Sequence, residues 1–149
     1  MTIKDRLARV LGVWEGTYTH LTPEGRRLDH FGSRQETRVV GDRWYERIVY
    51  RWADGRTQTL DFRASFVDEG RRVVFDDPEF EGESFVVGED ILVFPYRWKK
   101  RPQERVVETI VFSSPERRAR LWQTFEGEEL RRITVIVERR IQGEPEVWT

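Results

Sequence analysis

The chain has 149 residues, of which 38% are hydrophobic and 13% aromatic, so it carries enough large apolar side chains to exclude an intrinsically disordered protein. Its 26 basic and 27 acidic residues leave a net charge of −1, which gives no electrostatic footprint for a nucleic acid or an anionic membrane. Cysteine is absent, which excludes disulfides, thiolate metal sites and a cysteine nucleophile. The charged first ten residues do not fit a signal peptide, and no segment is long enough to span a membrane. We therefore expect one cytoplasmic domain over residues 1–149.

The first predicted element is a short helix over residues 2–11. Its apolar residues recur at the spacing of one helix face: Ile3, Leu7, Val10 and Leu11. Thr2 can cap the helix, and Asp5, three residues later, completes a variant of the capping box. Gly12 is expected to end the helix.

After Gly12 the hydrophobic period changes to two, which predicts strands. Ten segments are expected: 13–21, 26–40, 43–52, 56–66, 71–75, 84–87, 91–98, 105–112, 118–125 and 129–141. Residues 76–83 are expected to form a polar loop. Short turns such as Asp54-Gly55 separate the strands and indicate an antiparallel meander. We predict an all-β fold, an up-and-down barrel of about ten strands with a short N-terminal helix. The same local pattern also fits an open sandwich.

Gly12-Val13-Trp14, at the junction of the helix and the first strand, resembles the Gly-x-Trp motif of the calycin superfamily. That group includes lipocalins, fatty-acid-binding proteins and nitrobindin-like haem proteins. The resemblance implies that Trp14 closes one end of the barrel and packs against an arginine of the last strand. Arg139 and Arg140 match that position, and we assign the role to Arg139.

Alternation along the strands predicts which side chains face a ligand inside the barrel. The aromatic face of segment 43–52 is expected to point inward and to carry Glu46 with it. The predicted ligand-binding residues are Tyr18, His20, Trp44, Glu46, Tyr50, Phe62, Trp122 and Arg132. In the last segment, the apolar set of Ile133, Val135 and Val137 is expected to pack on the helix and the core.

These features favour binding of a small, largely hydrophobic molecule, with or without an anionic group met by arginine. No metal-ligand spacing occurs. Nitrobindin-like proteins hold haem through a histidine near the C-terminus, whereas His20 and His30 lie early in this chain, so we expect no cofactor.

Two other functions stay open. One is a barrel enzyme of the isomerase, hydrolase or cyclase type that acts on a hydrophobic substrate, with His20 or Glu46 as its acid or base. A hydrogen bond between either side chain and a second polar group in the pocket would favour it. The other is a β-domain with a filled interior that binds a partner, including a homodimer formed through an exposed strand.

Overall fold

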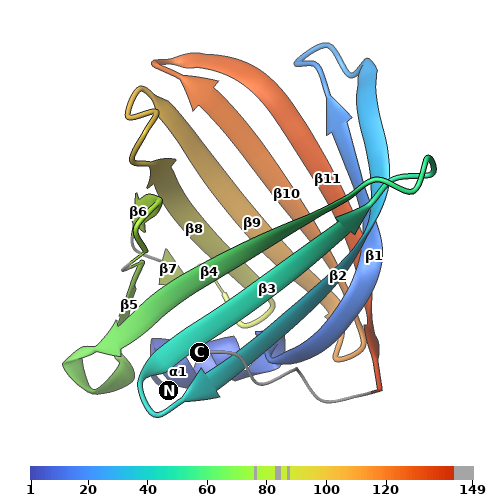
Figure 1. Ribbon diagram of the computed structural model, residues 1–149. Coiled ribbons are helices and arrows are strands. Elements are labelled where there is room, and N and C mark those ends of the chain that lie inside the picture. Colours follow the sequence, from blue (N-terminus) through green and yellow to red (C-terminus); the bar gives the residue numbers. More distant parts are fainter. Residues whose placement is uncertain (76, 83–84, 87, 143–149) are drawn as a thin grey trace.

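The computed structural model describes residues 1–75, 77–82, 85–86 and 88–142, in which one antiparallel sheet curls into a nearly closed barrel (Figure 1). The strands are β1 (Gly12–Leu21), β2 (Arg27–Val40), β3 (Arg43–Arg51), β4 (Thr57–Val67), β5 (Arg72–Val74), β6 (Phe80–Gly82), β7 (Phe85–Val86), β8 (Ile91–Trp98), β9 (Glu104–Ser114), β10 (Arg117–Glu126) and β11 (Glu129–Ile141). They lie in the order β5-β4-β3-β2-β1-β11-β10-β9-β8-β6, and β7 pairs with β8. The predicted all-β barrel of about ten strands is confirmed.

The N-terminal helix α1 (Ile3–Leu7) continues into a 3-10 turn over Ala8–Val10 and lies across the end of the barrel where β1 begins (Figure 1). The capping box predicted at its start is present, because Asp5 N donates to Thr2 Oγ1 at 3.1 Å and Thr2 N donates to Asp5 Oδ2 at 2.8 Å. A second 3-10 turn, Asp68–Gly70, joins β4 to β5. Among the residues described above, no helix has the length and apolar character needed to cross a lipid bilayer.

The barrel closes between its two short outermost strands, β5 and β6. Phe75 N, just after β5, donates to Gly82 O in β6 at 3.0 Å. The prediction of a loop over 76–83 is wrong for residues 80–82, which form β6. The cause is a single side chain, because Phe80 is buried against Phe62 and Phe75 although its neighbours in the sequence are polar. Three residues are too few to show a period of two.

The inward face of β11 is the polar one. Thr134, Ile136 and Glu138 are buried, whereas Val137 is 58% exposed. The prediction that Ile133, Val135 and Val137 pack on the helix and core is therefore wrong. The apolar side chains of this strand do not face the interior because buried arginines of the neighbouring strand need a carboxylate partner there, and Glu138 of β11 supplies it.

Gly16 lets β1 and β11 approach closely at the middle of the barrel wall. The two strands pair with Gly16 opposite Glu138. A Cβ atom at Gly16 would lie 1.9 Å from Val137 O and 2.8 Å from the Cα of Glu138, both backbone atoms. A Cβ atom at Gly32, on the neighbouring strand, would meet nothing closer than Arg51 O at 3.7 Å. The motif therefore extends to Gly-x-Trp-x-Gly, since the second glycine is required by the packing of the two strands.

We expect Gly16→Ala to lower the free energy of unfolding by about 1–3 kcal/mol, because the added methyl group forces two backbones apart. Gly32→Ala is the matched control and should leave stability unchanged or raise it by about 0.5–1 kcal/mol, since alanine loses less conformational entropy than glycine in a strand. Urea denaturation followed by circular dichroism measures both. Equal stability of the two variants would contradict the close approach at Gly16.

Candidate functional site

One end of the barrel is closed by the indole of Trp14, which is completely buried. Trp14 Nε1 donates to Val10 O at 3.0 Å, which fixes the ring beneath the 3-10 turn. Two guanidiniums lie over the ring, with Arg118 Cζ 4.1 Å and Arg140 Cζ 4.4 Å from its centroid. Such cation–π contacts are favourable and add to the burial of the ring. We call this closed end the floor of the barrel.

Arg140, and not Arg139, occupies the arginine position assigned at the floor. Alternation along β11 turns Glu138 and Arg140 inward, so the side chain of Arg139 lies outside and is exposed. Arg140 Nη2 donates to Arg9 O at 2.7 Å, and Nη1 donates to Leu11 O. These bonds satisfy carbonyls at the end of the 3-10 turn and hold it against the ring. Gly12 leaves room for this guanidinium, because a Cβ atom there would lie 2.8 Å from Arg140 Nη1.

Above the floor lies a buried group of charges that we call the interior charge cluster: Glu108 of β9, Arg118 and Arg120 of β10, and Glu138 of β11. Both arginines share one carboxylate oxygen, since Arg118 Nε and Arg120 Nε donate to Glu138 Oε1 at 2.9 and 2.8 Å. Arg120 Nη1 donates to Glu108 Oε2 at 2.9 Å. The side chains of Arg118 and Glu138 have no exposed surface.

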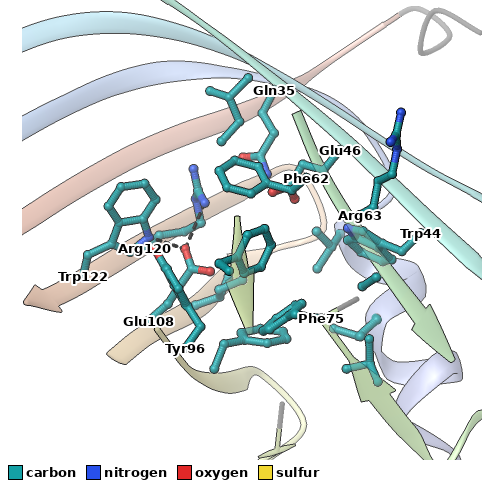
Figure 2. A pocket seen from close by; sticks show the side chains of 18 of the residues that line it. Gln35, Trp44, Glu46, Phe62, Arg63, Phe75, Tyr96, Glu108, Arg120 and Trp122 are labelled. Carbon is teal, nitrogen blue, oxygen red and sulfur yellow. Dashed lines mark hydrogen bonds and ion pairs between the residues drawn. The ribbon is translucent and has the colours of Figure 1, made fainter. Parts of the chain in front are cut away.

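Neutral side chains also form hydrogen bonds with the interior charge cluster. Arg118 Nη2 donates to Gln35 Oε1 at 2.8 Å, Arg120 Nη2 donates to the Tyr18 hydroxyl, and Trp122 Nε1 donates to Glu108 Oε2. Figure 2 shows Glu108 beside Arg120 and Trp122, with Gln35 and Glu46 next to each other. Strong pairing of this kind is what allows charged groups to be buried.

The barrel interior contains two cavities that share walls. The lower cavity, of about 60 Å³, is lined by residues that include Trp44, Glu46, Phe62, Tyr96, Glu108 and Trp122. The mouth cavity, of about 390 Å³, is lined by residues that include His20, Tyr50, Tyr96, Trp98, Trp122 and Arg132. His20 is the second-last residue of β1 and Trp98 ends β8, so the mouth cavity lies at the end of the barrel opposite α1. Tyr96 and Trp122 line both cavities.

Seven of the eight predicted ligand-binding residues line one or both cavities. Trp44, Glu46 and Phe62 line the lower cavity, His20, Tyr50 and Arg132 line the mouth cavity, and Trp122 lines both. Tyr18 lines neither, because its ring is fully buried between Phe31 and Tyr50, at centroid distances of 5.5 and 4.8 Å.

The sequence interpretation missed the four members of the interior charge cluster and Gln35. Alternation could have found the charged ones. Arg118 and Arg120 fall on the same face of their strand as Trp122, and Glu108 on the same face as Ile110, both of which face the lower cavity. Gln35 has no such signal, because nothing in its local sequence distinguishes it from a surface glutamine.

Glu46 is one of the titratable groups that line the lower cavity. Burial raises its pKa to about 7, an effect that Glu108 reinforces and that Arg120, Arg118 and a hydrogen bond with Gln35 partly offset. Its carboxyl is therefore partly protonated near neutral pH. A group in this state can donate a proton, accept one, or bind a hydrogen-bond donor.

His20 stands at the mouth and is neutral at pH 7. Burial, helped by the charge of Arg132, lowers its pKa to about 4, although Asp29 acts in the opposite direction. His20 Nδ1 lies 2.7 Å from Thr134 Oγ1. His30 lies apart from the cavities and contacts Thr19, with Nδ1 2.8 Å from Oγ1. Across the described ranges, no three His, Asp or Glu side chains are grouped so that they could hold a metal ion.

Comparison with known proteins gives a family and a fold. A family model described as "Domain of unknown function (DUF3598), N-terminal" matches residues 4–143. A protein of unknown function from the DUF3598 family of Nostoc punctiforme has a similar structure, with a TM-score of 0.72 and 17% sequence identity over 91% of this chain. The match spans 49% of the Nostoc chain, so the present chain corresponds to about half of that protein's length.

Two further solved structures share the barrel. The S-type phycobiliprotein lyase CPES from Guillardia theta has a TM-score of 0.73 and 14% identity, over 97% of this chain and 95% of its own. Rv2717c from M. tuberculosis has a TM-score of 0.66 and 15% identity, over 95% of this chain and 99% of its own. At these identities the likeness establishes the fold alone. No curated protein matches the sequence significantly.

Glu138→Gln should lower the free energy of unfolding by about 3–5 kcal/mol, because it leaves two buried guanidiniums with one carboxylate fewer. Glu129→Gln makes the same chemical change at an exposed pair, where Glu129 Oε2 lies 2.8 Å from Arg131 Nη2, and should cost no more than about 1 kcal/mol. Chemical denaturation at pH 7 measures the two. Similar losses in both variants would show that the interior charge cluster does not carry the stability assigned to it.

The raised pKa of Glu46 predicts a pH effect on stability. Its pKa of about 7 in the folded state lies above the ordinary glutamate value of 4.5, so the folded state binds more protons between these values and is destabilised as the pH rises through them. Glu46→Gln does not titrate, so its stability relative to the natural protein should rise from pH 4.5 to pH 7.5. Glu138 has a lowered pKa and the opposite slope, but it is common to both proteins and cancels. A constant difference across this range would contradict the burial of Glu46.

Proposed function

We propose that this chain, which belongs to the DUF3598 family, binds a small hydrophobic molecule inside its barrel. The observation that carries the proposal is the mouth cavity, whose volume of about 390 Å³ falls in the range of ligand sites, roughly 300–1,000 Å³. It lies opposite the end that α1 and Trp14 close, so a ligand enters there and stops above the floor.

Aromatic walls support a hydrophobic ligand. The rings that line the mouth cavity are those of Phe31, Tyr50, Trp52, Tyr96, Trp98 and Trp122. Several of them already pack on one another, with Phe31 and Trp52 centroids 4.5 Å apart, so their positions are fixed before a ligand arrives. A preformed apolar wall reduces the entropy that binding costs and rewards apolar surface on the ligand by roughly 25 cal/mol per Å².

We also propose that the family belongs to the calycin superfamily. The support for this is the indole of Trp14 at the start of β1, which closes one end of the barrel and lies under the guanidinium of Arg140 from the last strand. The S-type phycobiliprotein lyase CPES from Guillardia theta has a similar barrel, and a barrel of this kind has room for one small ligand in its interior.

Acid–base catalysis in the same cavity is the second candidate. It is favoured by Glu46, whose pKa of about 7 suits proton transfer near neutral pH and whose carboxyl contacts Gln35 inside the lower cavity. If it holds, a hydrophobic compound bound by the protein is converted to a product, and Glu46→Gln binds that compound without converting it.

Native mass spectrometry of the protein purified from its own host tests the binding function without a choice of ligand. We expect an added mass that is lost on denaturation and that identifies the compound. A protein that carries no ligand and also fails to bind any apolar probe would contradict the proposal.

Trp122→Ala should weaken binding of the neutral fluorophore N-phenyl-1-naphthylamine at least tenfold, because the indole lines both cavities. Tyr45→Ala is the control, since Tyr45 lies on the outer face of β3 beneath Arg38. Fluorescence titration measures the dissociation constants. If the two variants bind equally well, the ligand does not lie against Trp122.

A further inference from the structure

We propose that the lower cavity selects ligands whose inner end is a protonated amine or another N–H donor, which the Glu46 carboxylate accepts, and that it rejects an anionic inner end. The inference rests on the proposed ligand binding and adds the chemical class of group that reaches the bottom of the site. The sequence predicted an anionic group bound by arginine. In the structure, however, the interior arginines Arg118 and Arg120 are already paired with carboxylates.

The count of charges around the lower cavity favours a positive guest. Two guanidiniums, Arg118 and Arg120, face three carboxylates, Glu46, Glu108 and Glu138. Pairing with Glu138 and Glu108 already matches both positive charges, so an ionised Glu46 is left as a surplus negative charge. Arg63 of β4 also lines the lower cavity, but its guanidinium points away from the interior charge cluster and is left out of this count (Figure 2).

The charges of the two interior arginines are already matched by carboxylates. Arg120 donates through Nε, Nη1 and Nη2 to Glu138, Glu108 and Tyr18. Arg118 donates through Nε and Nη2, to Glu138 and Gln35. Of the nitrogens of these two guanidiniums, Nη1 of Arg118 is the one that is buried without a hydrogen-bond partner in the described part of the chain. Its two N–H groups can meet a neutral acceptor, but the charge of Arg118 is already matched and does not offset an anion placed beside three carboxylates.

Glu46 has accepting capacity to spare. An ionised carboxylate offers about four lone-pair positions, and the Gln35 amide uses one of them. The side chain stands between Trp44 and Phe62, which also line the lower cavity. An ammonium group of small size fits beside these rings, because both the carboxylate and the faces of aromatic rings attract cations.

Electroneutrality separates the possible guests. With Glu46 protonated and no guest, two positive charges face two negative ones. A cation that displaces the proton gives three of each, whereas an anion leaves an unmatched negative charge even when Glu46 stays protonated. Unmatched buried charge costs several kcal/mol, so the cation or a neutral donor is preferred. Because the pKa of Glu46 is about 7, binding of a cation near neutral pH also expels a proton.

An anionic part of a ligand is accommodated at the other end. Arg132, predicted as a ligand-binding residue, lines the mouth cavity together with Lys100 and Arg101, where Asp29 and Glu79 are the opposing carboxylates. The structure therefore orients an amphiphilic ligand, with its N–H group toward Glu46 and any acid toward the mouth.

The test uses three probes with the same ring: 1-naphthylmethylamine, 1-naphthalenemethanol and 1-naphthoate. At pH 7 we expect the amine to bind at least tenfold more tightly than the carboxylate, with the alcohol between them. Glu46→Gln should reduce the preference for the amine to below about threefold. Glu129→Gln, the same change at an exposed position that lines neither cavity, should leave the preference intact. Isothermal titration calorimetry measures all of these.

A second readout uses the unaltered protein and does not depend on how a variant folds. Titrations in two buffers with different heats of ionisation should show that the amine releases protons at pH 7 and that the alcohol does not. Tighter binding of the carboxylate than of the amine, or a preference that survives in Glu46→Gln, overturns the inference but leaves the proposed function standing. If none of the three probes binds, the inference fails, and the proposed function is then decided separately by native mass spectrometry.

Discussion

The sharing of one carboxylate, that of Glu138, by two guanidiniums is the interaction on which the rest of the structure depends. It joins β10 to β11 inside the barrel, and the remaining donors of Arg118 and Arg120 extend the connection to β2, β1 and β9 through Gln35, Tyr18 and Glu108. These polar contacts connect five strands that are neighbours in the sheet. They fix the register, since a shift of the strand pairing by one residue would turn every one of these charges to the outside. Arg118 also lies over Trp14, so the same contacts hold the floor.

The close packing of β1 and β11 and the position of the buried charges are linked where Gly16 lies opposite Glu138. Gly16 leaves room for the backbone and side chain of Glu138 on the neighbouring strand β11, and two residues later the strand pairing places Arg140 over the indole of Trp14. Above this level the interior changes from charged to aromatic, with Tyr18, Phe31 and Tyr50 in mutual contact. The barrel therefore has one apolar core at the floor, around Trp14, and a second above it, around Tyr18, and the interior charge cluster contacts both. The two cavities share Tyr96 and Trp122 as walls.

Local patterns in the sequence predicted the parts of the fold that depend on local chemistry. The capping box at Thr2, the turn at Asp54-Gly55 and the alternation around Trp44 need only neighbouring residues to be understood. The errors arose where distant strands decide the outcome. Phe80 makes a strand of a polar segment because Phe62 and Phe75 are there to pack on it, and Val137 is outside because arginines on another strand require Glu138 inside. Arg139 and Arg140 could not be distinguished without the register that places Arg140 opposite Trp14.

The charges of the interior charge cluster pair with one another, whereas the carboxyl of Glu46 remains available to a ligand. A crystal structure of the protein with 1-naphthylmethylamine tests this arrangement. We expect the ring to lie against Trp122 and Tyr96, with the ammonium nitrogen at hydrogen-bonding distance, about 2.7–2.9 Å, from a Glu46 oxygen. Density for the amine at the mouth, or Glu46 turned into a salt bridge with an arginine that has left Glu138, would contradict it.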